Sequence, residues 1–210
     1  MAHSHIDVTS LQLDLTEEIK EKLHQLCRLF QSRMNGATAE QMRLCYGESK
    51  NYTANDGVAL SDIKDIAEFI RNSNDEKLSF KSEVEFSLLW RSGIREAMLI
   101  ALLLVPNKMI TPSLIVKWMR SIPTLEMAEM LPFLTGWKTE KPDETIKEAL
   151  KLPATAIRNT CINYLMGRFL QHGKALKRDT IESHLTTLPN CDSMTIEYQS
   201  YTFLQSQLNR

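Results

Sequence analysis

The sequence predicts an all-α protein, built as an α-α superhelix of about eleven helices in antiparallel pairs. Three observations support this fold class. The 210 residues include only seven glycines, no segment of strand length alternates apolar and polar residues, and many segments carry apolar side chains at helical spacing. A globular helical bundle would show the same periodicity and is the alternative architecture.

In the first half of the chain, apolar stripes and the polar residues that interrupt them define the helices. The predicted helices cover the stripe from Ile19 to Phe30, then 38–46, a segment that Ser61 caps and the polar run 72–75 ends, about 76–91, and 94–105. The Asn55-Asp56-Gly57 turn is expected in the loop before the third helix. Gly93 is expected to divide the last two helices.

Proline marks two helix starts in the second half, because Thr111-Pro112 and Leu152-Pro153 place it where a first helical turn tolerates it. The predicted helices are 112–120, 124–134, 142–151, 153–171, 179–188 and 193–208. Helix pairs of this length repeat at roughly 35 to 45 residues, the period of HEAT-type repeats. We therefore expect one HEAT-like, armadillo-like repeat domain over residues 1–210, with residues 1–12 as a mobile tail.

The composition argues against several classes of protein. The longest apolar run, residues 97–105, is well short of the roughly 20 residues that span a bilayer. No basic and apolar leader marks the N-terminus for secretion. The four cysteines are far apart and include no CxxC pair, which predicts free, mostly buried thiols rather than disulfides or a zinc site. These features predict a monomeric, cytoplasmic protein with no membrane contact and no cofactor.

Charge is distributed unevenly, although the formal net charge is only −1. Residues 1–80 carry 9 basic and 13 acidic residues, while residues 81–210 carry 16 and 13. Between residues 149 and 178 there is no carboxylate. The basic residues there are Lys151, Arg158, Arg168, Lys174, Lys177 and Arg178. This run predicts either a basic surface for an anionic partner or an ordinary solvated face.

Motifs that mark common enzymes are absent, since the sequence has no GxSxG, HExxH, GxxxxGK[ST] or GxGxxG. Two carboxylates remain candidates, because Glu126 and Glu129 are three residues apart on the predicted helix 124–134 and so share one face. Trp90, Trp118 and Trp137 all fall in the middle third of the chain. Packing between helices is the usual role of a tryptophan in that setting.

The segment "MRLCYGESKNYTANDGVALSDIKDIA" at 42–67, followed by "LLWRSGIREAMLIALLL" at 88–104, resembles the DNA alkylation repair family of alkylpurine DNA glycosylases (AlkD-type). The shared pattern is a Met-Arg opening, an Asn-x-Gly-Val loop, and a Leu-Trp-x-Ser-x-x-Arg-Glu helix that enters an apolar run. A helix bearing a tryptophan follows. The resemblance covers about residues 38–170 and implies a HEAT-like solenoid whose concave, basic face holds duplex DNA and releases cationic alkylated purines.

The resemblance also implies where a cleft would lie. The family carries a Trp-Trp-Asp-x-x-Asp element, and the matching stretch here is "PTLEMAEM". Thr124 and Leu125 stand at the tryptophan positions, while Glu126 and Glu129 stand at the two aspartates. The arginine that completes the cleft falls on Arg158. For the last tryptophan of the family, Tyr201 or Phe203 is the nearest aromatic residue.

Three functional hypotheses follow. The first is a DNA-3-methyladenine/7-methylguanine glycosylase-like enzyme in which Glu129, with Glu126 and Arg158, forms the catalytic site. The second is a DNA-binding repeat protein without catalysis. The third is a scaffold that binds a protein or peptide on its concave face. In both DNA hypotheses the predicted DNA-binding residues are Lys151, Arg168, Lys174, Lys177, Arg178 and Trp118.

The stretch at 88–104 is expected to begin in water and end in the core. Arg91, Ser92, Arg95 and Glu96 are expected at the wet end. Because Arg95 and Glu96 are adjacent on a helix, we expect them to point to different sides and not to pair. Their expected role is structural.

Overall fold

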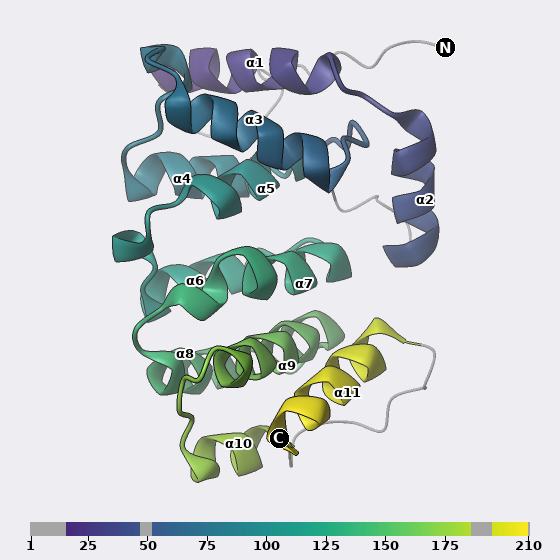
Figure 1. Ribbon diagram of the computed structural model, residues 1–210, viewed down its shortest axis with the longest axis vertical. Coiled ribbons are helices and arrows are strands. Elements are labelled where there is room, and N and C mark those ends of the chain that lie inside the picture. Colours follow the sequence, from purple (N-terminus) through teal and green to yellow (C-terminus); the bar gives the residue numbers. More distant parts are fainter. Residues whose placement is uncertain (1–15, 47–51, 186–194, 210) are drawn as a thin grey trace. The chain divides into compact units, whose positions relative to one another are not determined.

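The computed structural model describes residues 16–46, 52–185 and 195–209 (Figure 1). Within these ranges the chain forms eleven α-helices and no β-strand, and a single bridge joins Ala54 to Ile94. The predicted all-α class and number of helices are therefore confirmed. The tail expected at residues 1–12 lies outside the described residues. None of the described helices is long and apolar enough to cross a membrane.

The chain divides into two compact units, residues 1–105 and 106–210. The first unit contains α1 (Glu17–Gln31), α2 (Gly36–Tyr46), α3 (Leu60–Asn72), the 3-10 turn η3 (Glu76–Leu78), α4 (Glu83–Arg91) and α5 (Arg95–Leu104). Its centre is α5, which packs against α1, α3 and α4. Residues 97–102 are all buried, because this apolar run has no polar face to turn towards water.

Caps decide the helix boundaries in the first unit. The prediction of one helix over 76–91 is wrong: a short 3-10 turn comes first, and α4 begins after Ser82, which forms a capping box with Glu85. The expected cap at Ser61 is also wrong, since Ala59 occupies the N-cap position of α3. The division at Gly93 is confirmed, because this residue adopts φ +69° between α4 and α5.

The second unit contains η4 (Asn107–Met109), α6 (Pro112–Met119), α7 (Leu125–Leu134), η5 (Gly136–Lys138), α8 (Pro142–Leu150), α9 (Ala156–Gln171), α10 (Arg178–Leu185) and α11 (Ile196–Leu208). Its central helix is α9, which packs against α7, α8 and α11 and is buried continuously over residues 158–167. In addition, α8 contacts both α6 and α10. The proline at the start of α6 follows a Thr111 cap, as predicted. The start predicted at Pro153 is wrong, because Thr155 caps α9, which begins at Ala156.

A buried polar contact fixes the loop before α3 onto the start of α5. The backbone N–H groups of Asp56 and Val58 donate to the Glu96 carboxylate, each at 3.3 Å. Arg95 Nη1 donates to the Val58 carbonyl at 3.0 Å and lies 3.1 Å from Glu96 Oε1. The two segments that carry the family resemblance therefore meet in one structural contact.

The expectation that Arg95 and Glu96 lie in water and do not pair is wrong. Arg95 is 2% exposed and Glu96 0% exposed, and the two side chains form an ion pair. Ser92 is buried as well, whereas Arg91 is exposed. Both charged side chains turn towards the same loop, because its buried peptide groups need hydrogen-bond partners. Their structural role is to join that loop to α5.

Burial shifts the pKa values of ionisable groups around this contact. Burial raises the pKa of Asp56 to about 6, and the neighbouring charge of Glu96 adds to the rise. Burial likewise raises the pKa of the Cys27 thiol to about 12, so this thiol is not a nucleophile at neutral pH. Cys27 and Cys161 are both buried and free, which confirms the predicted buried thiols at these two positions.

Gly57→Ala is expected to destabilise the protein more than Gly173→Ala. Both glycines have positive φ, +67° and +69°, where a side chain costs roughly 1–2 kcal/mol. At Gly57 a Cβ would also lie 2.2 Å from the Asn35 carbonyl oxygen, whereas nothing lies within 4 Å of a Cβ at Gly173. Urea unfolding of both variants measures the difference. Equal losses of unfolding free energy would contradict the close approach at Gly57.

Candidate functional site

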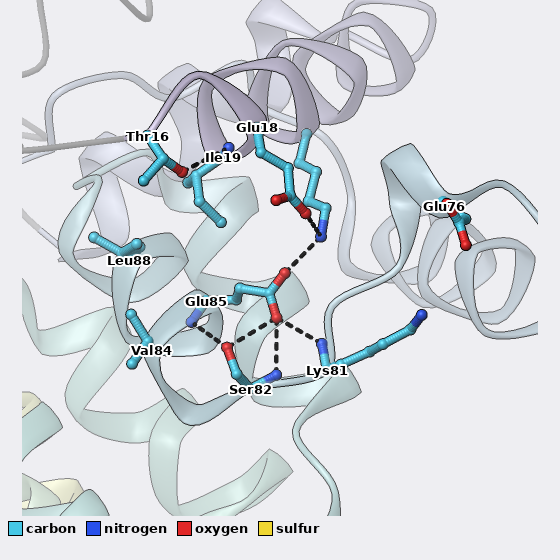
Figure 2. A pocket seen from close by; sticks show the side chains of 10 residues that line it. Thr16, Glu18, Ile19, Glu76, Lys81, Ser82, Val84, Glu85 and Leu88 are labelled. Carbon is cyan, nitrogen blue, oxygen red and sulfur yellow. Dashed lines mark hydrogen bonds and ion pairs between the residues drawn. The ribbon is translucent and has the colours of Figure 1, made fainter.

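The first unit has a surface hollow of about 520 Å³ between α1 and α4 (Figure 2). Lys22 Nζ lies 2.6 Å from Glu85 Oε1 and 3.0 Å from Glu18 Oε1. Glu85 Oε2 also accepts hydrogen bonds from the N–H groups of Lys81 and Ser82, both at 2.8 Å. Burial would raise the pKa of Glu85, but these bonds lower it to about 2. The charged side chains at the centre of this hollow thus pair with one another, and the pair of Lys22 with Glu85 joins α1 to α4.

The second unit carries two facing stripes of side chains, one on each of two packed helices. On α7 and the turn after it, Glu129, Phe133 and Trp137 are spaced by four residues. On α9 and its C-cap the stripe is Tyr164, Arg168 and His172, with the same spacing. These six residues and Phe203 of α11 are called the C-terminal cluster below. Residues four apart share one face of a helix, which relates Glu129 to Phe133 and Tyr164 to Arg168. Trp137 lies beyond the end of α7, and its contact with Arg168 joins it to the others.

Three aromatic rings meet in the middle of the C-terminal cluster. The ring centroids of Phe133 and Tyr164 are 5.3 Å apart, in an edge-to-face arrangement. Phe203 lies 5.8 Å from Phe133 and 5.6 Å from Tyr164. It can approach because Gly167 has no side chain: a Cβ there would lie 2.4 Å from Phe203 Cε1. Helices α7, α9 and α11 each contribute one ring.

At the other end of the cluster, cations surround an aromatic stack. The rings of Trp137 and His172 are parallel to within 9°, with centroids 3.6 Å apart. The Arg168 guanidinium lies 5.6 Å from the Trp137 ring centroid, within cation–π range. Lys174 donates to the Thr139 carbonyl. Partial burial, with the charges of Arg168 and Lys174, lowers the pKa of His172, so this imidazole is neutral at pH 7.

Glu129 lies at the aromatic end of the cluster. It is half-buried on α7, and its charge acts on Tyr164, which is 6% exposed. Burial raises the pKa of Tyr164 to about 12, and the charge of Glu129 adds to the rise, so the phenol stays protonated at neutral pH. Glu126, the other predicted carboxylate, is 5% exposed in the first turn of α7 and is not presented at the surface.

Arg158 lies in a buried polar network at the start of α9. It is 6% exposed, and burial lowers its pKa. Its Nη1 donates to Asn159 Oδ1 at 3.2 Å and its Nη2 to the Leu150 carbonyl at 3.4 Å. Six residues separate Arg158 from Tyr164, which places them about 120° apart around the helix. The arginine that shares the stripe of Tyr164 is Arg168.

The basic residues between 149 and 178 do not form one continuous patch. Lys151 caps the C-terminal end of α8 and lies 2.5 Å from Glu148. The backbone N–H of Lys177 donates to Asp143, in the first turn of α8, so Lys177 is at the opposite end of that helix. Arg178 is exposed and pairs with a glutamate one turn later. Glu148 and Glu182, the carboxylate partners of Lys151 and Arg178, stand just outside the basic run, so a charge count within the run omits them.

Trp118, which was predicted to contact DNA, is 1% exposed on α6. Its ring is therefore packed in the core and is not available to a ligand on the surface. The tryptophan that belongs to the C-terminal cluster is Trp137, which is half-buried. Of the predicted DNA-binding cations, Arg168 and Lys174 lie at this cluster.

Sequence reasoning missed four members of the cluster. These are Phe133, Trp137, Tyr164 and His172. The pattern that could have found them is the four-residue spacing that runs forward from Glu129 and in both directions from Arg168. That pattern predicts each stripe separately. Only the packing of α7 on α9 shows that the two stripes face each other.

Comparisons with protein-family models, with curated proteins and with solved structures found no match. The resemblance to the DNA alkylation repair family, and the site residues that it implies, therefore stay predictions.

Proposed function

We propose that this chain is a HEAT-like repeat protein that binds duplex DNA and releases cationic alkylated purines from it. In the second unit, α8 contacts both α6 and α10, and α9 contacts both α7 and α11. This packing supports a repeat arrangement of two rows. The row of α7, α9 and α11 carries the C-terminal cluster, and we assign it to DNA.

The observation that carries the proposal is a half-buried carboxylate beside a set of aromatic rings. Thr124 and Leu125 cannot supply the aromatic wall that the family resemblance implies. The half-buried rings of Phe133 and Phe203 offer a replacement from two different helices, and the buried Tyr164 ring packs behind them. A cationic base is attracted both to aromatic faces and to a carboxylate, and Glu129 supplies the carboxylate.

The reaction needs little acid catalysis, because the alkylated purine already carries a positive charge. The bond between C1′ and N9 breaks, and its electron pair neutralises the purine ring. Positive charge then develops on the sugar, where the Glu129 carboxylate stabilises it. Water attacks C1′ and transfers a proton to Glu129, which releases it to solvent. The products are a neutral alkylated purine and an abasic site in the DNA.

Glu129→Gln is expected to lower base release from methylated duplex DNA at least about 100-fold, because an amide neither carries the charge nor accepts the proton. Affinity for the same DNA should change little, since Glu129 contacts no phosphate in this mechanism. Chromatography of the released bases measures the rate, and fluorescence anisotropy measures the affinity.

Glu144→Gln is the matched control for this variant. Glu144 is an exposed glutamate on α8 of the same unit, outside the C-terminal cluster, and its replacement should leave base release unchanged. Base release that is equal in Glu129→Gln and in the unaltered protein would remove Glu129 from the mechanism.

A second candidate function is a scaffold that binds a protein or peptide segment. The observation that favours it is the pairing of several cations with carboxylates, as in Lys151 with Glu148 and Lys174 with Glu140. Because carboxylates pair with some of these six cations, the basic run attracts a phosphate backbone less strongly than six unpaired cations would. Methylated duplex DNA that neither binds nor loses a base would favour this second function.

A further inference from the structure

We propose that Trp137 and His172 form a stacking platform for an unpaired nucleotide, with Arg168 and Lys174 beside it to hold the phosphate. This inference rests on the proposed function, because it assumes that DNA lies along the row of α7, α9 and α11. It adds a class of ligand that the alkylpurine reaction does not require: DNA with a single-stranded end or an unpaired base.

The platform has one covered side and one open side. Trp137 is half-buried in the turn after α7, and His172 is exposed at the end of α9. Their rings are stacked at 3.6 Å. The tryptophan therefore supports the imidazole from within, and the imidazole is presented to solvent. A neutral imidazole offers a flat π face on which a base can stack.

Two positive charges flank the platform. The Arg168 guanidinium lies 5.6 Å from the Trp137 ring and 5.0 Å from the Phe133 ring, so two aromatic faces hold it in place. Lys174 is positioned by the left-handed turn at Gly173 and by its bond to the Thr139 carbonyl. A charge held in advance loses less side-chain entropy when it binds a phosphate.

One carboxylate lies close to these cations. Lys174 Nζ is 3.6 Å from Glu140 Oε1, and Glu140 is 93% exposed. A pair with so exposed a carboxylate at this distance is weak and can open, so Lys174 can exchange Glu140 for a phosphate. Arg168 Nη1 donates to Gln171 Oε1 at 2.7 Å, a neutral acceptor that leaves the arginine charge uncompensated by this contact.

Aromatic rings beside cations are the usual means of binding single-stranded nucleic acid, because each base has a π face and each nucleotide has a phosphate. A base inside a duplex has both faces covered by its neighbours. An unpaired base, as in a single-stranded overhang, has a free face that can stack on His172. The platform should therefore distinguish DNA by the presence of unpaired nucleotides rather than by sequence.

The test compares the affinity of the full chain for a blunt duplex and for the same duplex with a short single-stranded overhang. We expect the overhang to tighten binding about tenfold, within the range for stacking of one base. His172→Ala should abolish this gain, and His172→Phe should retain it, because a phenyl ring also stacks. Tyr198→Ala, which removes an exposed aromatic ring from α11, is the control and should leave the gain unchanged.

The outcomes separate this inference from the proposed function. Binding of the blunt duplex without any gain from the overhang overturns the platform and leaves the proposed function standing. A gain that survives in His172→Ala overturns the platform as well. Binding of the overhang DNA that depends on His172, without binding of the blunt duplex, supports the platform and contradicts the duplex role. Binding of neither DNA overturns both.

Discussion

Glu96→Leu is expected to lower the free energy of unfolding by about 3–5 kcal/mol, the usual cost of removing one partner of a buried ion pair. The substitution leaves the Arg95 guanidinium buried without its carboxylate. It also removes the acceptor of the Asp56 and Val58 N–H groups. Buried donors without an acceptor carry their full desolvation cost. Urea unfolding followed by far-UV circular dichroism measures the loss.

The control for this variant is Glu68→Leu on α3. Glu68 is exposed, so the same change of side chain should alter the free energy of unfolding by no more than about 0.5 kcal/mol. A loss below about 1 kcal/mol in Glu96→Leu would contradict the account of the loop before α3 as fixed by this carboxylate.

A second large effect is expected from pH, through a buried histidine in the second unit. His184 is 0% exposed, and its Nε2 lies 2.7 Å from Asn163 Oδ1. Asn163 in turn donates to Ser200 Oγ at 2.9 Å, which links α9, α10 and α11. Burial, with the charge of Arg158, lowers the pKa of His184 to about 4. Protonation of this network is therefore disfavoured in the folded protein.

The unfolded histidine takes up a proton near pH 6.5, while folded His184 stays neutral until about pH 4. The stability that His184 contributes is thus complete above pH 6.5 and is lost as the pH falls to 4, by about 3 kcal/mol. His184→Gln keeps a hydrogen-bond donor without this titration. The variant should lose less stability than the unaltered protein over the same interval.

Urea unfolding at pH 8, 6, 5 and 4 tests this expectation. The difference in unfolding free energy between the two proteins at pH 8 reports the change in packing. The fall of the unfolding free energy below pH 8 reports the titration of His184. Asp56, whose pKa is raised to about 6, acts in the opposite direction between pH 6 and 4, but it does so in both proteins and cancels in the comparison. Parallel pH profiles in the two proteins would contradict the buried, neutral state of His184.

The fold could be predicted from the sequence wherever a local rule determines the structure. Proline after a threonine cap located the start of α6, and the continuous apolar run located the central helix of the first unit. The start of α4 was missed, because residues 76–82 contain no glycine or proline that would mark a break before the capping box at Ser82. Local rules also failed for Arg95 and Glu96. They are adjacent on α5, yet they form an ion pair because both turn towards the loop before α3, which is distant in the sequence.

The candidate site was less predictable, because its members come from three helices. Glu129 was identified as a carboxylate on the correct helix, and Arg168 and Lys174 as cations. Phe133, Trp137 and Tyr164 were missed, since apolar residues at helical spacing predict a core before they predict a ligand surface. The basic run was misleading because the charge count stopped at its ends. It omitted Glu148, which pairs with Lys151 three residues later, and Asp143, which accepts a hydrogen bond from the distant backbone N–H of Lys177.

The central claim is that the second unit binds duplex DNA through the row of α7, α9 and α11. The most direct measurement is the affinity for a fluorescent blunt duplex at several salt concentrations. We predict a linear fall of log K with log salt concentration, and a slope reduced by about 2 when Arg168 and Lys174 are both changed to glutamine. Lys151 lies at the end of α8, outside the row of α7, α9 and α11, so Lys151→Gln should leave the affinity and the slope nearly unchanged. No binding at low salt, or a slope that the double variant does not alter, would contradict the claim.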